Sequence, residues 1–276
     1  MTSEYDLHCH SNVSDGFLAP AEVVQRAANQ GVKTLALTDH DTGQGIKQAQ
    51  QAADQCAINL IPGIELSVSW SHHCFHIIGL NINPEYPPLV QGTNHLQTIR
   101  QERAEKIANK LQKKGIDGAF EAVKKIAGNG MITRTHFADF LVNNNYVSDQ
   151  QAAFNRYLRK GKPAFVASQW TELEQAIDWI IQSGGIAIIA HPLRYNLTGS
   201  KLKKFIEAFK ASGGSGIEVV TGRYNQGEIN LVSQYAKKHD LLGSIGSDFH
   251  TPKQSWVELG KLAPLPSDIT PVWSQF

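Results

Sequence analysis

The chain has 276 residues, of which 41% are hydrophobic, and a formal net charge of +1 at pH 7. This length is enough for one large α/β domain, alone or with an insertion. The near-neutral charge argues against a broad basic surface for long nucleic acids, whose binding depends on neutralising many phosphates. It still permits a local basic pocket for a nucleotide or a short oligonucleotide.

The first residues lack the basic-then-apolar order of a signal peptide, and no apolar run is long enough to cross a membrane. The three cysteines, Cys9, Cys56 and Cys74, are widely spaced and form no CxxC pair. An odd number of cysteines suits a reducing compartment. We therefore expect a soluble cytoplasmic protein with no obligatory protein partner.

Short apolar segments alternate with longer amphipathic ones in the first third of the chain. Pro20 suits the first turn of a helix, and Gly31 suits the position just after its end. In chain order we expect a strand at 5–8, a helix at 20–30, a strand at 33–38, a helix at 44–54, and strands at 59–68 and 74–82. The last two strands are separated only by a short linker, so we expect them to pair antiparallel.

The pattern becomes mostly helical from 94 to 159. We predict that 94–159 form an inserted helical cap subdomain, and that 1–93 and 160–276 form one metal-binding barrel domain. After the insertion, strands and helices alternate again: helices are expected at 172–183, 201–212 and 227–239, and strands at 186–190, 216–220 and 242–245. Such alternation predicts an α/β fold with a parallel sheet, open or closed into a barrel.

Histidines and carboxylates gather at the ends of the expected strands. His8 and His10 are two residues apart, so their side chains point to the same face of a strand. The carboxyl ends of parallel strands are where active-site residues meet in α/β folds. A mixed set of imidazoles and carboxylates suits Zn, Mn or Fe, and nine ligands suit two or three ions. The candidate ligands are His8, His10, Asp15, His40, Glu65, His76, His191, Asp248 and His250.

The other histidines lack this placement. His72 and His73 fall in a presumed turn, and His95 and His239 stand alone. A lone histidine is more often a surface or core residue than a ligand, so we assign these four no role.

The strand-end motifs resemble those of the polymerase and histidinol phosphatase (PHP) family. The matching segments are Asp6-Leu7-His8-Cys9-His10-Ser11, Thr38-Asp39-His40-Asp41, Gly63-Ile64-Glu65, Ala190-His191-Pro192 and Ser247-Asp248-Phe249-His250. The resemblance implies a distorted (β/α)7 barrel that hydrolyses phosphoesters at a site of three divalent ions, most often Mn, with Zn or Fe as alternatives. All nine ligand positions of the family are present.

Within the family, the chain is most similar to nucleoside 3′,5′-bisphosphate phosphatases, a group also described as 5′-to-3′ exoribonucleases. The segments Arg134-Thr135-His136 and Pro192-Leu193-Arg194-Tyr195 carry this narrower resemblance. It implies that Arg134, His136 and Arg194 hold the 5′-phosphate of a nucleoside 3′,5′-bisphosphate or of a short 5′-phosphorylated single-stranded RNA. The alternative for the two arginines is a surface ion pair.

The expected chemistry is attack of a metal-activated hydroxide on phosphorus. We expect Glu65 and Asp248 to bridge ions and, with His191, to form the catalytic centre. Asp6, Asp39 and Asp41 would either orient imidazoles or, for the last two, cap a turn. Tyr195, Tyr224 or Phe137 would either stack on the base or belong to the core.

Three alternatives remain open at this point. A histidinol-phosphate phosphatase would use the same scaffold without a 5′-phosphate clamp. An amidohydrolase also places a His-x-His pair on a barrel, but it often needs a carboxylated lysine at a strand end, and this chain has no lysine in a matching position. A non-catalytic PHP interaction module would not need the complete ligand set.

Overall fold

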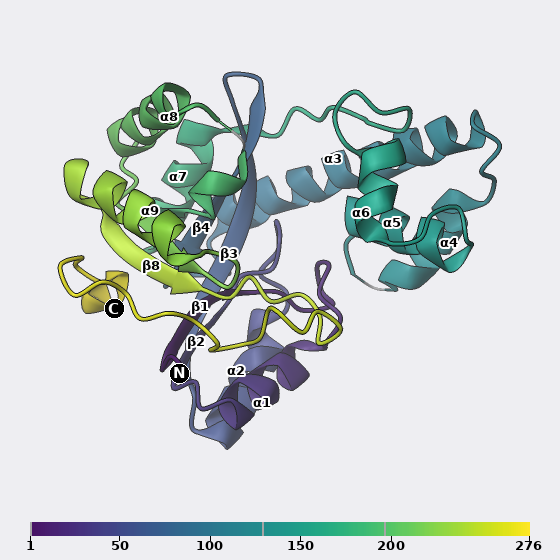
Figure 1. The fold of residues 1–276 in the computed structure, drawn as a ribbon. Helices are drawn as coiled ribbons and strands as arrows, with labels where there is room; N and C mark the ends of the chain where they lie inside the picture. Colours follow the sequence, from purple (N-terminus) through teal and green to yellow (C-terminus); the bar gives the residue numbers. More distant parts are fainter. Residues whose placement is uncertain (1, 129, 196) are drawn as a thin grey trace.

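The computed structural model describes residues 2–128, 130–195 and 197–276. Its centre is a mixed β-sheet in which neighbouring strands follow the order β1-β2-β3-β4-β6-β7-β8 (Figure 1). A short additional strand, β5 (Thr171–Glu172), pairs with β3. The strands of the main path are β1 (Tyr5–Cys9), β2 (Thr34–Leu37), β3 (Asn59–Trp70), β4 (His73–Leu80), β6 (Ile186–Ile189), β7 (Gly216–Thr221) and β8 (Leu242–Gly246).

The sheet is nearly closed into a barrel, as the sequence predicted. β1, β2 and β3 run parallel, as do β6, β7 and β8. The long β4 is antiparallel to both of its neighbours, which confirms the expected β3–β4 pair. The two ends of the sheet meet where Cys9 and Phe249 form a bridge and the His10 N–H donates to the Phe249 carbonyl at 2.9 Å. The polar residues that follow β1 and β8 are thereby brought side by side.

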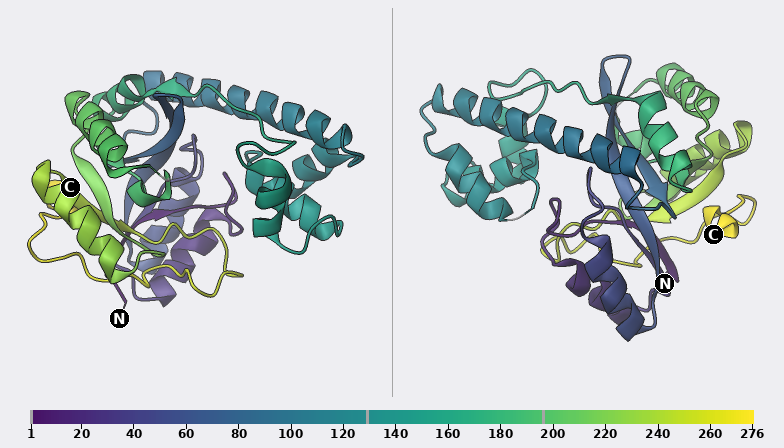
Figure 2. Two further views of the ribbon diagram at one scale, coloured as in Figure 1. Left: turned by 45° about the horizontal axis from the view of Figure 1, so that its top comes forward. Right: turned by 180° about the vertical axis from the view of Figure 1, so that it is seen from behind.

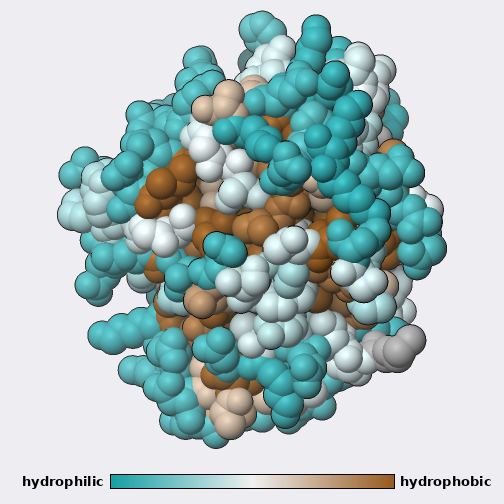
Figure 3. All heavy atoms as spheres, turned by 90° about the vertical axis from the view of Figure 1, so that its left-hand side faces the viewer, coloured by the Kyte–Doolittle hydropathy of each residue, from teal (hydrophilic) through white to brown (hydrophobic). Residues whose placement is uncertain are grey.

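Helices cover the outside of the barrel. α1 (Pro20–Asn29) and α2 (Ile46–Cys56) lie next to each other at the end of the barrel that carries β1 and β2 (Figure 1). The other covering helices are α7 (Leu173–Gln182), α8 (Gly199–Ala211) and α9 (Gln226–Lys238). On the side of α8 and α9 the surface is largely hydrophilic, with hydrophobic side chains visible between the polar ones (Figure 3). In the described part of the chain, no helix is both long and apolar enough to span a bilayer.

The helical region stands to one side of the barrel and has an apolar core of its own, which includes Phe137 and Leu141. Its elements are α3 (Pro87–Gln112), α4 (Ala119–Ala127), α5 (Arg134–Asn143), α6 (Gln150–Ala153) and the π-helical turn η1 (Phe154–Leu158). α3 is a long continuous helix that joins it to the barrel (Figure 2).

The helix α3 begins before the domain boundary that we placed between 93 and 94. Its proline at the first helical position, Pro87, fixes the start, because proline needs no helical N–H partner there. Leu96 packs in the barrel core and Leu111 packs in the core of the helical region. One rigid element is thus shared by both cores, and the division into 1–93 plus 160–276 and 94–159 remains a prediction.

Candidate functional site

The nine candidate ligands converge at one edge of the barrel. β1 supplies His8 and, directly after its end, His10. The segments that follow β2, β6 and β8 supply His40, His191 and the Asp248/His250 pair, and the loop after β1 supplies Asp15. β3 and β4 contribute Glu65 and His76 from within the strands.

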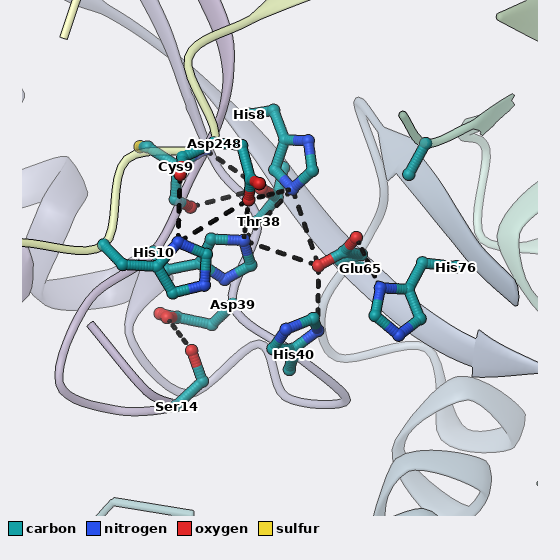
Figure 4. A network of polar contacts seen from close by, with 12 residues as sticks. His8, Cys9, His10, Ser14, Thr38, Asp39, His40, Glu65, His76 and Asp248 are labelled. Atoms are coloured by element: carbon teal, nitrogen blue, oxygen red, sulfur yellow. Dashed lines mark hydrogen bonds and ion pairs between the residues drawn. The ribbon is translucent and has the colours of Figure 1, made fainter. Parts of the chain in front are cut away.

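Glu65 lies at the centre of this cluster and is fully buried (Figure 4). Its Oε1 is 3.0 Å from His76 Nδ1 and 3.0 Å from His191 Nε2. Its Oε2 is 2.8 Å from His40 Nδ1, 3.5 Å from His8 Nε2 and 3.4 Å from His10 Nε2. One carboxylate thus faces five imidazoles.

The two aspartates add further carboxylate oxygens beside the imidazoles. Asp248 Oδ1 is 3.2 Å from His10 Nε2 and 3.4 Å from His8 Nε2. Asp15 Oδ1 is 3.3 Å from His250 Nε2 and 3.9 Å from His40 Nε2. Together with Glu65 they surround the imidazoles with anionic oxygens.

The donor atoms fit metal ions better than they fit one another. His8 Nε2 and His10 Nε2 lie 3.0 Å apart. His40 Nδ1 and Glu65 Oε2 lie 2.8 Å apart, yet neither has a hydrogen-bond partner of acceptable geometry among the described residues, and Asp15 Oδ1 is likewise without one. Buried polar atoms normally have a hydrogen-bond or metal partner, so these three atoms fit ligation of a shared metal ion.

Three overlapping groups have donor atoms close enough to share an ion. They are His10, Asp15, His40 and His250; His8, His10 and Glu65; and His40, Glu65 and His76. Nitrogen and carboxylate donors of this kind bind divalent metals. The cluster is therefore a divalent-metal site by its chemistry.

The electrostatics keep Glu65 and His10 in the forms that bind metal. Burial opposes ionisation of Glu65, but His40 and His76 outweigh it and hold the pKa of Glu65 well below its usual value. Burial, together with His250, lowers the pKa of His10 to about 3, so that imidazole stays neutral. Metal ligation needs deprotonated donors, and both residues meet this condition at neutral pH.

Glu218, on β7, supports the cluster and was missed by the sequence analysis. His8 Nδ1 donates to Glu218 Oε1 at 2.8 Å, which leaves His8 Nε2 free for a metal. The His191 N–H donates to Glu218 Oε2 at 2.6 Å and fixes the start of the next loop. The sequence signal was a single carboxylate in the apolar strand Gly216–Thr221, whose residues are all buried.

The aspartates expected to orient imidazoles bind other groups. Asp6 accepts the backbone N–H groups of Ser247 (2.8 Å) and Gly260 (2.9 Å). Asp39 accepts the Ser11 N–H (2.7 Å) and the Ser14 hydroxyl (2.6 Å), and so anchors the loop that carries Asp15.

Asp41 accepts the Ser67 N–H (2.6 Å) and Arg100 Nε (2.7 Å). Among the described residues, none of these three carboxylates binds a histidine ring, so the hypothesis of imidazole partners is wrong for Asp6, Asp39 and Asp41. All three carboxylates fix backbone around the site.

Backbone geometry at the strand ends is unusual. His191 and Asp248 have φ values of 28° and 55°, in the left-handed region that non-glycine residues rarely adopt. Strained residues of this kind concentrate at functional sites. At Gly246 an added Cβ would lie 2.3 Å from His8 Cβ, so only glycine lets β8 pass this close to the ligand.

The predicted phosphate-binding residues lie around the metal site. His136, on the first turn of α5, accepts the Thr133 N–H through Nδ1 at 3.0 Å, so its hydrogen is on Nε2. Thr135 Oγ1, on the same turn, is 3.4 Å from Asp15 Oδ2. Arg134 is placed over the Phe154 ring at 5.9 Å and has no carboxylate partner among the described residues. The first turn of α5 thus reaches the edge of the cluster.

Arg194 enters the site from the barrel side. One of its Nη atoms is paired with Asp248 and the other, Nη2, has no partner in the described part of the chain. Asp248 outweighs burial and raises the pKa of Arg194. The guanidinium therefore contacts a candidate metal ligand directly and keeps one donor free.

The three aromatic residues considered for base stacking are largely structural. Phe137 is fully buried in the core of the helical region. The Tyr195 hydroxyl accepts the His76 N–H and donates to the Ala190 carbonyl, both at 2.9 Å. The Tyr224 hydroxyl accepts the Leu193 N–H at 2.9 Å. For all three, the core alternative fits the structure.

A near-closed α/β barrel with histidines and carboxylates converging at its strand ends defines a metal-dependent hydrolase. The chain belongs to the PHP domain family, whose domain matches residues 6–190. It is 46% identical over the full length of both chains to the 5′-3′ exoribonuclease of Haemophilus influenzae.

It is also 41% identical to the 3′,5′-nucleoside bisphosphate phosphatase of Chromobacterium violaceum, across 98% of this chain and 95% of that one. A solved structure of an amidohydrolase from Chromobacterium violaceum, with bound sulfate and no metal, has a TM-score of 0.95 and 41% identity. The match covers 99% of this chain and 95% of that one.

Proposed function

We propose that this protein is a metal-dependent phosphoesterase with two related activities. It removes the 3′-phosphate of nucleoside 3′,5′-bisphosphates, converting pAp to AMP. It also releases 5′-mononucleotides from short 5′-phosphorylated single-stranded RNA, as a 5′-to-3′ exoribonuclease. The names of its relatives in Haemophilus influenzae and Chromobacterium violaceum support both activities.

The observation that carries the proposal is the position of unused guanidinium donors near the metal-ligand cluster, from Arg194 Nη2 beside Asp248 and from Arg134 on the first turn of α5. The nine ligands would hold divalent ions, three in number and most suitably Mn, with Zn or Fe as alternatives. Bound ions of this kind supply a hydroxide at neutral pH and neutralise charge on the phosphoryl oxygens. Glu65 and Asp248 would bridge between ions, and His191 would complete the catalytic centre beside Glu65.

The role of the remaining residues is to fix the other end of the substrate. A guanidinium binds phosphate through paired N–H donors, and Arg134 and Arg194 each have donors to offer. His136 adds a neutral N–H donor, since burial lowers its pKa. If these three hold the 5′-phosphate, the 3′-phosphate of the same nucleotide faces the metal ligands, whether it is terminal or a diester.

We place the protein in the cytoplasm. Its three cysteines are free, including the buried Cys9, as expected in a reducing compartment.

The deciding experiment is product analysis on pAp and on a 5′-phosphorylated RNA pentamer with Mn present. We expect AMP and phosphate from pAp, and successive 5′-mononucleotides from the RNA. Histidinol phosphate serves as the comparison substrate, because it lacks a second phosphate for the arginines. Faster hydrolysis of histidinol phosphate than of pAp would contradict the proposal.

Arg134→Ala tests the 5′-phosphate clamp. Hydrogen bonds to charged groups contribute about 1.5–3 kcal/mol, so kcat/KM for pAp should fall by about 10- to 100-fold. Hydrolysis of 3′-AMP, which has no 5′-phosphate, should change little. The matched control is Arg159→Ala, which removes an exposed arginine of the same region whose side chain hydrogen-bonds to Asn155 alone among the described residues. Equal losses on pAp and 3′-AMP would show that Arg134 does not read the 5′-phosphate.

A further inference from the structure

Two large aromatic side chains, Phe17 and Trp256, are exposed on the chain segments that also carry candidate metal ligands. Phe17 is 55% exposed and Trp256 is 64% exposed, the two highest values among the exposed large hydrophobic residues in the described part of the chain. Phe17 follows the loop after β1, and Trp256 lies in the segment after β8. In Figure 1 these two segments, coloured purple and yellow, lie together on the side of the barrel that faces the helical region.

Phe17 is tied to the metal centre through its backbone. Its N–H donates to the His250 carbonyl at 2.7 Å. Two residues earlier, Asp15 faces inward, with Oδ1 at 3.3 Å from His250 Nε2. The same short loop therefore presents a candidate metal ligand on its inner side and an exposed aromatic ring on its outer side.

Two cations accompany the exposed rings. Lys253 Nζ lies 4.6 Å from the centre of the Phe17 ring. Arg223, which follows β7, donates from Nη2 to Gln254 Oε1 at 3.3 Å. Neither cation has a carboxylate within ion-pair distance among the described residues, whereas nearby Arg26 is paired with Glu258. Lys253 and Arg223 therefore carry positive charge that no carboxylate of the described residues neutralises by an ion pair.

An aromatic ring flanked by unpaired cations is the combination that binds single-stranded nucleic acid. Bases stack on the ring, and the cations follow the phosphates. A nucleoside bisphosphate ends at the metal site and leaves this surface uncovered. An RNA chain, by contrast, continues beyond the scissile phosphate and must lie against some part of the rim.

We propose that Phe17, Lys253, Arg223 and Trp256 form a binding surface for the RNA chain on the 3′ side of the scissile phosphate. The inference rests on the proposed function and adds to it the residues that favour RNA over a bisphosphate. Phe17 stacks on the first base beyond the cut, Lys253 and Arg223 bind the following phosphates, and Trp256 stacks further along the chain.

The test compares two substrates for each variant: pAp and a 5′-phosphorylated RNA pentamer. For Phe17→Ala we expect kcat/KM on the pentamer to fall about tenfold, which is the usual scale for loss of one stacked base, with pAp within twofold of the wild type. Phe17→Tyr should retain the ring and the activity on RNA, whereas Phe17→Leu should not. The control is Phe276→Ala, which removes an exposed aromatic residue at the C-terminus, far from this surface in Figure 1.

Lys253→Ala and Arg223→Ala test the proposed phosphate contacts independently of the aromatic rings. Each should weaken RNA binding and reduce its dependence on salt concentration, since fewer counterions are then released. If both sets of variants lose activity equally on pAp and on RNA, these residues only support the loops that carry the metal ligands. If none of the variants loses activity on RNA, the RNA chain lies against another part of the protein. Either result overturns the inference. If the wild type hydrolyses pAp but not RNA, the inference fails while the phosphatase proposal stands; if it hydrolyses neither, the proposed function itself fails.

Discussion

The carboxylates on the barrel side of the site and the arginines on its helical side differ in the partners that they meet. On the barrel side, Glu65 and Asp15 face imidazoles and no lysine or arginine among the described residues. On the helical side, Arg103 and Arg134 stack on Trp170 and Phe154, and neither meets a carboxylate in the described part of the chain.

An unpaired buried charge is costly. Burial, reinforced by Arg134 and Arg100, lowers the pKa of Arg103 to about 9. The clustered carboxylates therefore suit metal ions, and the unpaired arginines suit an anion.

Arg100 is the exception that links the two sides. It lies on α3, but its Nε and Nη2 atoms are 2.7 Å and 2.6 Å from Asp41 Oδ2 at the strand end after β2. Its Nη2 also donates to Ser67 Oγ at 2.8 Å. Two of its three side-chain nitrogens are thus bound to the barrel, so this arginine holds α3 against it.

Glu65→Gln gives the largest expected effect, because it removes the central charge of the barrel side. Metal ions contribute several kcal/mol to transition-state stabilisation, so pAp hydrolysis should fall by about 10³-fold or more. Bound metal, measured by mass spectrometry after dialysis against Mn, should fall with it. Circular dichroism checks that the variant is folded. Unchanged metal content and turnover would contradict the role of Glu65 as a ligand.

Arg100→Ala tests the link between the two sides. It leaves the buried Asp41 without its arginine partner, and breaking a buried ion pair in this way costs about 3–5 kcal/mol. The expected result is a loss of that size in the free energy of unfolding, measured by urea denaturation. Arg100→Lys should lose less, because it retains the charge without the paired donors. A loss below about 1 kcal/mol would mean that α3 is held mainly by its apolar contacts.

Glu218→Gln sharpens the comparison within the barrel side. An amide cannot accept from both His8 Nδ1 and the His191 N–H, so one ligand loses its support. Loss of such a partner lowers metal affinity about 10- to 100-fold. A titration of apo-protein with Mn measures the change, and at saturating Mn the activity on pAp should largely recover. If activity stays low at saturating Mn, Glu218 acts on the reaction rather than on metal affinity.

The α/β sheet and the convergence of its ligands could be predicted from local patterns, whereas closure of the sheet into a barrel was implied only by the resemblance to the PHP family. The i,i+2 spacing of His8 and His10 sets a common direction within one strand. The position of the other ligands at strand ends brings them together once the strands align. The alternation of strands and helices predicts the sheet itself, although β4 makes it mixed rather than parallel.

The supporting residues could not be predicted, because their partners are distant in sequence and share no spacing rule. Asp39 looked equivalent to Asp41 in Thr38-Asp39-His40-Asp41, yet one binds Ser11 and Ser14 and the other binds Arg100. The start of α3 at Pro87 was also missed. The first turns of this helix bury residues such as Leu89 and Leu96 against the barrel, and they lack the charged pattern that identified the rest of the helix.

Lys106→Ala gives the smallest expected effect and is the matched control for Arg100→Ala on the same helix. The sequence reveals the Glu102–Lys106 pair by its i,i+4 spacing, and the structure places Lys106 Nζ 3.3 Å from Glu102 Oε2, with the side chains 62% and 60% exposed. Exposed pairs of this kind contribute about 0.3–0.5 kcal/mol, and the better helix propensity of alanine offsets part of that loss. Urea denaturation should therefore give nearly the wild-type free energy of unfolding. A loss comparable to that of Arg100→Ala would contradict this argument. It would show that the burial of the Arg100–Asp41 pair does not explain why that pair contributes more than the exposed Lys106–Glu102 pair.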